Sequence, residues 1–356
     1  MPELNEGGVE RGVVEMNREM VLRGVQSYVI SKGGRLVKQI EQEGGHHVAM
    51  DVCSKNPLSV PFRSLALRKE IRKIQPSIIH ARSRVPAWLC KFANRGPRIP
   101  FVTTVHGINR PNAYSKIMAS GDRVICVGEP VRQHIDKHYS PDSSKISIIP
   151  RGVDTKAFTP EIVSKDAIDQ LKKKLGIEGK TVIGSVGRIS HVKGYETVIE
   201  ATSIVAKKRS DVVCVIFGGV HHKKSDYANR LQNLAKSVLP NKVLFPGSFS
   251  DMPLAYSICD VLVNASPKMG NVARTIVEAI AMNVPVLSTK LEGLEGLVQD
   301  NVNGYIFESG NSQALASKME QLLENPPANV RDTLSKEFTL DHMVESVLSV
   351  YQSLIK

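Results

Sequence analysis

Along the whole chain, short apolar segments alternate with longer segments in which apolar residues recur at helical spacing. This alternation predicts βαβ units, in which helices connect parallel strands. The predicted strands are 26–31, 46–52, 77–80, 99–107, 122–128 and 145–150 in the first half, and 181–187, 212–219, 242–247, 260–266, 285–289 and 304–307 in the second. We therefore expect an α/β protein that binds ligands at the carboxyl ends of its strands.

The alternation is interrupted once, between 151 and 180, by a loop and a charged helix. Because 356 residues exceed one typical hydrophobic core, we interpret this interruption as a connection between two domains. The predicted organisation is a first domain over 1–152, a connection over 153–180, a second domain over 181–335 and a terminal amphipathic helix over 336–356. Very few residues precede the turn at Gly7 and Gly8, so the first strand is expected to be missing or stunted.

Composition indicates a globular protein of the cytosol. Hydrophobic residues make up 42% of the chain and charged residues 23%. There is no apolar run near the ~20 residues that a membrane span needs, and the first residues do not resemble a signal peptide. The five cysteines are scattered, which favours reduced, buried thiols over metal ligands.

Positive charge is concentrated in the first half. Residues 1–150 carry 23 Lys and Arg against 13 Asp and Glu, a balance of +10, out of +12 for the whole chain. Such a surface suits nucleic acid, an anionic membrane or a phosphorylated substrate. A nucleic-acid-binding protein is the weakest of these alternatives, because the basic clusters lack interleaved aromatic residues and any recognisable nucleic-acid-binding motif.

The stretch 266–289 combines loop, helix start, helix and strand. A helix N-terminus presents free N–H groups and a partial positive charge, which suit a phosphate. Glu278 lies about one turn inside the predicted helix, and on this stretch alone a solvated helix glutamate is the commoner role. A second stretch, 184–201, ends a strand at Gly187 and then carries Arg188 and Lys193, which could hold both phosphates of a diphosphate or be two ordinary surface cations.

Together, GRISHVKG, IIPRGVDTKAF and ARTIVEAIAMNVPVLST resemble the GT-B glycosyltransferases of family 4. LNEGGVERG, IIHARSRVPAW and PFVTTVHG are similar, within that family, to bacterial lipopolysaccharide-type sugar transferases. The resemblance implies two Rossmann-like domains with parallel sheets facing a central cleft, and a C-terminal helix that crosses back to the first domain. It also implies retaining transfer from a nucleotide sugar, without a metal or a further cofactor.

The resemblance assigns roles to individual residues. It places His106 at the donor sugar, Arg188 and Lys193 at the donor diphosphate, and Glu278 at the nucleotide ribose as the second acid of a Glu-x7-Glu motif. The remaining expected donor-site residues are Gly7, Gly8, Gly187, Gly218, Gly219, Gly270, Asn271, Val272, Ala273, Arg274 and Thr275. Arg82 and Arg84 are the acceptor-side candidates, and the acceptor is expected to be a lipid-linked or phosphorylated glycan at the inner face of the cytoplasmic membrane.

One departure from the family pattern leaves an alternative open. The first acid of the Glu-x7-Glu motif belongs at position 270, where this chain has glycine. The chain is therefore either an active sugar transferase or a decayed relative that binds nucleotide only. A Rossmann dehydrogenase is disfavoured because no GxGxxG opens a helix with an acid ~20 residues later.

Overall fold

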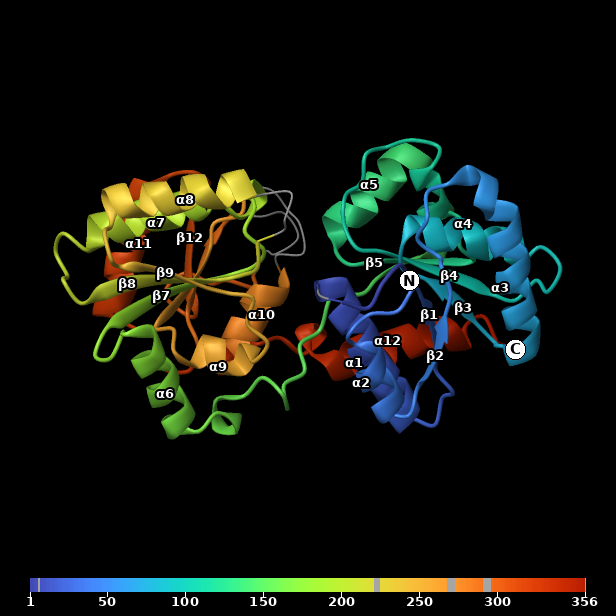
Figure 1. The fold of residues 1–356 in the computed structure, drawn as a ribbon, viewed down its shortest axis with the longest axis horizontal. Helices are drawn as coiled ribbons and strands as arrows, with labels where there is room; N and C mark the ends of the chain where they lie inside the picture. Colours follow the sequence, from blue (N-terminus) through green and yellow to red (C-terminus); the bar gives the residue numbers. More distant parts are fainter. Residues whose placement is uncertain (6, 221–224, 268–272, 291–295, 356) are drawn as a thin grey trace. The chain divides into compact units, whose positions relative to one another are not determined.

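The computed structural model describes residues 1–356 except 6, 221–224, 268–272, 291–295 and 356. Contacts divide the chain into two compact units. Unit 1 comprises Met1–Arg151 together with Leu340–Lys356, and unit 2 comprises Gly152–Thr339. Each unit has its own parallel sheet structure and its own helices (Figure 1).

Unit 1 contains a two-stranded sheet and a four-stranded sheet, ordered β1-β2 and β3-β4-β5-β6, with every pairing parallel. The strands are β1 Tyr28–Ser31, β2 His46–Ala49, β3 Ile79–Ala81, β4 Phe101–Val105, β5 Arg123–Cys126 and β6 Ile146–Ile148. The helices are α1 Gly8–Leu22, α2 Val37–Gln42, α3 Val60–Ile74, α4 Arg84–Ala93, α5 Glu129–Tyr139 and α12 Leu340–Gln352.

The terminal helix α12 completes the core of unit 1. Its apolar face packs with Met16 and Met20 of α1 against Val102 of β4 and Ile125 of β5. The three helices α3, α4 and α5 lie on the other side of the four-stranded sheet (Figure 1). Strand β4 is buried along its whole length, which explains its unbroken run of apolar and threonine residues.

Unit 2 contains one six-stranded parallel sheet in the order β12-β11-β10-β7-β8-β9. The strands are β7 Thr181–Val186, β8 Val212–Phe217, β9 Val243–Gly247, β10 Val261–Asn264, β11 Val286–Thr289 and β12 Gly304–Phe307. The helices are α6 Lys165–Leu175, α7 Tyr195–Val205, α8 Ser225–Val238, α9 Met252–Ser257, α10 Ala273–Ala281 and α11 Ser312–Glu324.

Helices cover both faces of this sheet. On one face α7, α8 and α11 pack in one apolar cluster, and on the other α6, α9 and α10 pack in a second (Figure 1). Because both faces are buried, the central strands read as continuous apolar runs, as in VVCVIF of β8. The predicted architecture, two α/β domains with parallel sheets, is confirmed.

One segment agrees with the sequence interpretation and one differs from it. Residues 1–4 belong to no strand, as expected, but they hydrogen-bond to the residues that follow β1: the Lys32 N–H donates to the Pro2 carbonyl over 3.0 Å and the Leu4 N–H to the Gly33 carbonyl over 2.9 Å. Residues 153–180, interpreted as a connection, lie within unit 2, because side chains from this segment such as Phe158 and Ile177 are buried in its core.

Candidate functional site

In unit 2, the chain turns sharply where β7 ends, at Gly187. This residue has φ 143°, and a Cβ added there would lie 2.7 Å from Cε of Lys193. The carbonyl of Gly187 accepts a 2.5 Å hydrogen bond from the hydroxyl of the buried Tyr195, the first residue of α7. Glycine therefore allows the Lys193 side chain to cross directly over the end of β7.

Arg188 and Lys193 are the two cations of this turn. Arg188 is exposed, and Lys193, at the end of the 3-10 turn His191–Lys193, is half-buried. Burial lowers the pKa of the Lys193 ammonium, and the neighbouring Arg188 guanidinium lowers it further. Across the part of unit 2 that the structure describes, neither side chain forms an ion pair with a carboxylate. Both charges are therefore available to an anionic ligand.

The end of β8 lies beside this turn. A Cβ on Gly218 would collide with the carbonyl oxygen of Gly187, so only glycine fits there. Gly219 is less restricted, since its added Cβ would lie 3.5 Å from Cβ of Ser248, an ordinary contact. The structure thus brings Gly187, Gly218 and Lys193 together at one edge of the unit 2 sheet.

Glu278 lies in the second turn of α10 and is almost entirely buried, with 4% of the residue exposed. One carboxylate oxygen accepts a 2.6 Å hydrogen bond from Nε of Arg274, and the other accepts a 2.8 Å hydrogen bond from the hydroxyl of Tyr256. These bonds satisfy a charge that would otherwise be costly to bury. A carboxylate has about four acceptor positions, and within the described residues these two bonds occupy two of them.

Several predicted donor-site residues precede this point in the chain. Gly270, Asn271 and Val272 lie outside the described residues. The backbone of Ala273 begins α10, and Thr275 in its first turn is half-buried.

In unit 1, Gly7 and Gly8 form the start of α1. Gly7 is the N-cap, with φ 140°, and the carboxylate of Glu10 lies so close that a Cβ on Gly7 would be 3.2 Å from its Cδ. Arg151 donates a 2.6 Å hydrogen bond from Nη2 to the Gly8 carbonyl. Its guanidinium lies against Gly12, where an added Cβ would be 2.6 Å from Cζ. A half-buried arginine thus packs against the first turns of α1 and hydrogen-bonds to them.

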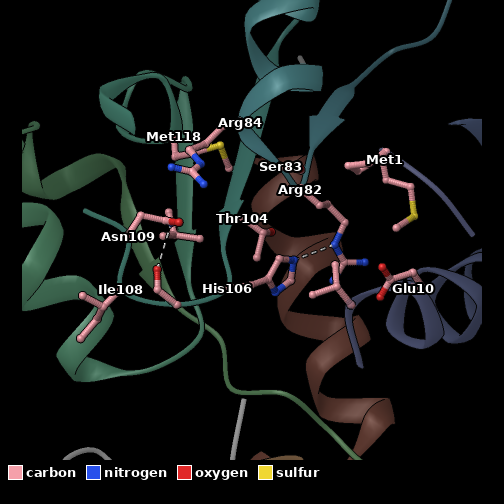
Figure 2. A pocket seen from close by; sticks show the side chains of 14 residues that line it. Met1, Glu10, Arg82, Ser83, Arg84, Thr104, His106, Ile108, Asn109 and Met118 are labelled. Carbon is pink, nitrogen blue, oxygen red and sulfur yellow. Dashed lines mark hydrogen bonds between the residues drawn. The ribbon is translucent and has the colours of Figure 1, made fainter. Parts of the chain in front are cut away.

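A pocket of about 350 Å³ lies beside this helix start, wholly within unit 1 (Figure 2). It contains the predicted residues His106, which follows β4, and Arg82 and Arg84, which follow β3. Nε of Arg82 donates to Nε2 of His106 over 3.3 Å, and Nη1 donates to the Gly12 carbonyl over 3.2 Å. Nη1 of Arg84 donates to Oγ of Ser115 over 3.1 Å.

His106 is uncharged at neutral pH. Burial lowers its pKa well below 6.5, and the Arg82 and Arg151 guanidinium groups lower it further. Because Nε2 faces the donor Nε of Arg82, the proton of the neutral ring belongs on Nδ1. His106 therefore presents an N–H donor on its other side.

Beneath this pocket, His80 of β3 is hydrogen-bonded from both ring nitrogens. Nδ1 lies 2.6 Å from the hydroxyl of Tyr351 on α12, and Nε2 lies 2.7 Å from Oγ1 of Thr104. Burial lowers the pKa of His80 well below 6.5, and Arg82 adds to the effect. The terminal helix is thereby joined to the strands that carry Arg82 and His106.

Sequence reasoning missed four residues of these sites. Thr104 and Asn109 flank His106 in the chain and line the same pocket, so the rule that ligands bind at strand ends could have found them. Glu10 also lines the pocket and follows the predicted glycine turn. Tyr256 has no such signal, because it comes 22 residues before Glu278 and from a different helix.

Among the residues with described positions, no group of three or more His, Cys, Asp or Glu side chains is placed to hold a metal ion. Within the same residues, no helix combines the length and the apolar character that crossing a bilayer requires.

Two α/β units with parallel sheets, and with candidate polar residues at the strand ends of each, define a GT-B type protein. The family model described as "Glycosyltransferase Family 4" matches residues 6–157, and that described as "Glycosyl transferases group 1" matches residues 167–338. The crystal structure of a glycosyltransferase from Rickettsia africae is 30% identical, covers 100% of this chain and 97% of its own, and has a TM-score of 0.89. The chain therefore belongs to the GT-B glycosyltransferases of this family.

The chain is also similar to two other proteins over almost its whole length. The lipopolysaccharide core biosynthesis mannosyltransferase LpsB of Rhizobium meliloti is 26% identical over an alignment of 361 positions, which covers 97% of this chain and 98% of the relative. The structure of HepE from Anabaena in complex with UDP and glucose has a TM-score of 0.85 at 21% identity and covers 99% of both chains. At that identity the HepE likeness shows the fold.

Proposed function

We propose that this glycosyltransferase is a retaining, metal-independent enzyme of the hexosyltransferase type. It moves a sugar from a nucleotide-sugar donor to a lipopolysaccharide-core acceptor or another glycolipid or polysaccharide. The donor class is supported by the HepE complex with UDP and glucose, and the acceptor class by the lipopolysaccharide core function of LpsB. The nucleotide sugar is the donor substrate, and the proposed reaction uses no further cofactor.

The observation that carries the proposal is the pair Arg188 and Lys193 at the end of β7. Neither cation has a carboxylate partner among the described residues, and one of them, Lys193, is desolvated, so the site gains from binding two negative phosphates. The close approach at Gly187 and Gly218 leaves backbone, without side chains, beside them. This arrangement suits the diphosphate of a nucleotide sugar.

The chemistry follows from where charge develops. When the bond between the sugar and the diphosphate breaks, negative charge grows on the phosphate oxygens, and Arg188 and Lys193 stabilise it. In a same-face attack the leaving phosphate helps to remove the proton of the acceptor hydroxyl, which retains the configuration of the sugar. His106, neutral and with a free N–H, donates a hydrogen bond to a hydroxyl of the donor sugar.

Glu278 is assigned to the ribose hydroxyls through its remaining acceptor positions. Its hydrogen bonds from Arg274 and Tyr256 hold the carboxylate in a fixed orientation before the nucleotide arrives. For the sugar end of the donor, the chain lacks the acid that the family pattern places at position 270. A nucleotide-binding relative without transferase activity is therefore the second candidate function.

Residues on α3 support peripheral contact with an anionic membrane at the cytoplasmic face. The helix and the residues before it expose large apolar side chains, Leu58 at 80% and Phe62 at 76%, and farther along the same face the cations Lys69, Arg72 and Lys73 are exposed. Apolar side chains next to lysine and arginine are the combination that binds a negatively charged lipid surface.

A panel of UDP-, GDP- and ADP-sugars tests the donor proposal by calorimetric binding and by slow sugar release. Lys193→Ala should weaken binding of the preferred donor about 10- to 100-fold, because a charge-assisted contact to phosphate is lost. Lys207→Ala, an exposed lysine after α7, is the matched control and should bind as wild type. Binding with sugar release supports the transferase, binding without release on any acceptor supports the decayed relative, and absence of binding contradicts both.

Sedimentation with vesicles tests the membrane proposal. Phe62→Ser should reduce binding to vesicles that contain phosphatidylglycerol, whereas Leu22→Ser, at a similarly exposed apolar residue of α1, should not. The proposed surface is contradicted if the two variants bind anionic vesicles equally well, or if the protein binds neutral vesicles as well as anionic ones.

A further inference from the structure

We infer that the hydroxyl group of Thr104 donates a hydrogen bond to a hydroxyl oxygen of the donor sugar, and that Tyr351 of α12 sets this direction through His80. Thr104 would then help to determine which sugar is bound. The inference rests on the proposed function, which assigns His106 of the same pocket to that sugar. A chain of three hydrogen-bonding side chains from α12, β3 and β4 carries it.

Thr104 is a buried threonine that lines the unit 1 pocket. It is the penultimate residue of β4, only 4% of it is exposed, and Figure 2 shows it with His106 among the side chains around the pocket. Its Oγ1 lies 2.7 Å from Nε2 of His80, the one hydrogen-bond partner of this hydroxyl among the described residues. A hydroxyl group has a single proton to donate, so the direction of this bond decides whether Thr104 offers the pocket a donor or an acceptor.

The imidazole ring of His80 has one proton to share between two partners. Burial lowers the pKa of His80 well below 6.5, and the nearby Arg82 guanidinium lowers it further, so the ring is neutral at neutral pH. Its Nδ1 lies 2.6 Å from the hydroxyl of Tyr351, on the side opposite Thr104. One ring nitrogen therefore donates and the other accepts, which leaves two possible directions for the chain.

The environment of Tyr351 decides between the two directions. If Nδ1 of His80 donated to Tyr351, the Tyr351 O–H would need another acceptor, and the described residues supply none. The hydroxyl is desolvated, since burial raises the pKa of Tyr351 to about 12. An unpaired buried donor is costly, so Tyr351 donates to Nδ1 and Nε2–H donates to Thr104. The O–H of Thr104 is then left to point into the pocket that this residue lines.

The other polar groups near the pocket do not take up this proton. Arg82 has only N–H donors, and Nε2 of His106 already accepts from Nε of Arg82 over 3.3 Å. The nearby acids are Glu10, which lines the pocket, and Glu15, whose charge acts on Arg82. Thr104 forms no described bond to either acid. With His106 and Thr104 both donating, the pocket selects a sugar that has a hydroxyl oxygen at each of the two places.

Nitrogen NMR of the histidine rings tests the direction of the chain without any ligand, with the His80 signals identified by their loss in His80→Asn. We expect the neutral tautomer with its proton on Nε2. Tyr351→Phe removes the donor to Nδ1 and should populate the other tautomer. Tyr28→Phe is the matched control, because Tyr28 also lies against a histidine ring, that of His46, but its hydroxyl has no described hydrogen bond. A wild-type His80 protonated on Nδ1 overturns the inference.

Calorimetry tests the contact with the sugar, using the preferred donor from the panel of UDP-, GDP- and ADP-sugars and its nucleoside diphosphate. Thr104→Val should weaken the nucleotide sugar about 3- to 10-fold and leave the diphosphate unchanged, because one neutral hydrogen bond to the sugar is lost. Thr104→Ser, which keeps the hydroxyl, should bind both nearly as wild type. Thr202→Val is the matched control, since this buried threonine donates to the Val198 carbonyl within α7.

Analogues of the donor sugar that each lack one hydroxyl group then identify the acceptor oxygen. For one analogue, the losses from the missing hydroxyl and from Thr104→Val should not add, since both remove the same bond. The inference is overturned if Thr104→Val does not weaken the nucleotide sugar, if it weakens the diphosphate equally, or if its effect adds fully to that of every analogue. If the wild-type protein binds no nucleotide sugar while the His80 tautomer is as expected, the proposed function has failed and the hydrogen-bond chain has not.

Discussion

Acid should destabilise unit 1 through two histidines that folding holds neutral. His80 and His106 both have pKa values lowered well below 6.5, first by burial and then by the nearby Arg82 guanidinium. In the unfolded chain both rings regain a pKa near 6.5. Below that pH the unfolded state binds more protons than the folded state, so stability is present above about pH 6.5 and is lost as the pH falls.

The magnitude follows from this proton linkage. A histidine that stays neutral in the folded protein costs about 1.3 kcal/mol when the pH changes from 7.0 to 5.5, the difference between RT ln(1 + 10^1.0) and RT ln(1 + 10^−0.5). Two such residues give about 2.5 kcal/mol. With a urea slope of about 2–3 kcal/mol/M, each histidine accounts for roughly 0.5 M in the unfolding midpoint.

Trp88 supplies the assay, because it is the single tryptophan of the chain and lies on α4 of unit 1. Its Nε1 donates to the Tyr114 carbonyl over 3.0 Å, so its fluorescence reports unfolding of this unit. Urea titrations at both pH values should show a midpoint shift that is about 0.5 M smaller in His80→Asn than in wild type. His138→Asn, at an exposed histidine of the same unit, should keep the wild-type shift. A wild-type midpoint that does not move, or an equal shift in His80→Asn, refutes the reasoning.

Two further substitutions examine unit 2. Gly218→Ala should abolish nucleoside diphosphate binding and destabilise the unit by at least about 2 kcal/mol, because the added Cβ meets the Gly187 carbonyl. The control Gly219→Ala should retain binding. If calorimetry and thermal unfolding show the same behaviour for both variants, the described packing at the ends of β7 and β8 is contradicted. Tyr256→Phe should cost about 1–3 kcal/mol in urea unfolding followed by circular dichroism, since the buried Glu278 carboxylate loses a donor, and an unchanged midpoint would show that this hydrogen bond is dispensable.

The sequence predicts the fold well because its signal is local. Strands such as β8 are buried on both faces and read as apolar runs, and glycines or prolines bound most elements. The segment 153–180 shows where prediction from local signals fails. Its helix α6 is highly charged and is therefore expected from the sequence to belong to a connection between domains, although Leu171 is buried in the unit 2 core. A few buried residues among many charged ones decide where such a segment packs.

The candidate sites are only partly readable from the chain. Strand-end rules find Arg188, His106 and Arg82, since each lies at or just after the end of a predicted strand. They do not find the partners that set the chemistry of these groups, because partners come from distant parts of the chain. Tyr256 bonded to Glu278 and Tyr351 bonded to His80 are contacts of tertiary packing, which periodicity does not encode.

The position of α12 has a consequence for biosynthesis. Unit 1 is built from the first 151 residues and the last 17, whereas unit 2 is a single continuous segment. During synthesis the ribosome therefore delivers all of unit 2 before it delivers the helix that covers Val102 and Ile125 of unit 1. Until α12 emerges, the apolar residues that it covers in the folded first unit are more exposed, so this is the stage at which chaperones are expected to bind the nascent chain.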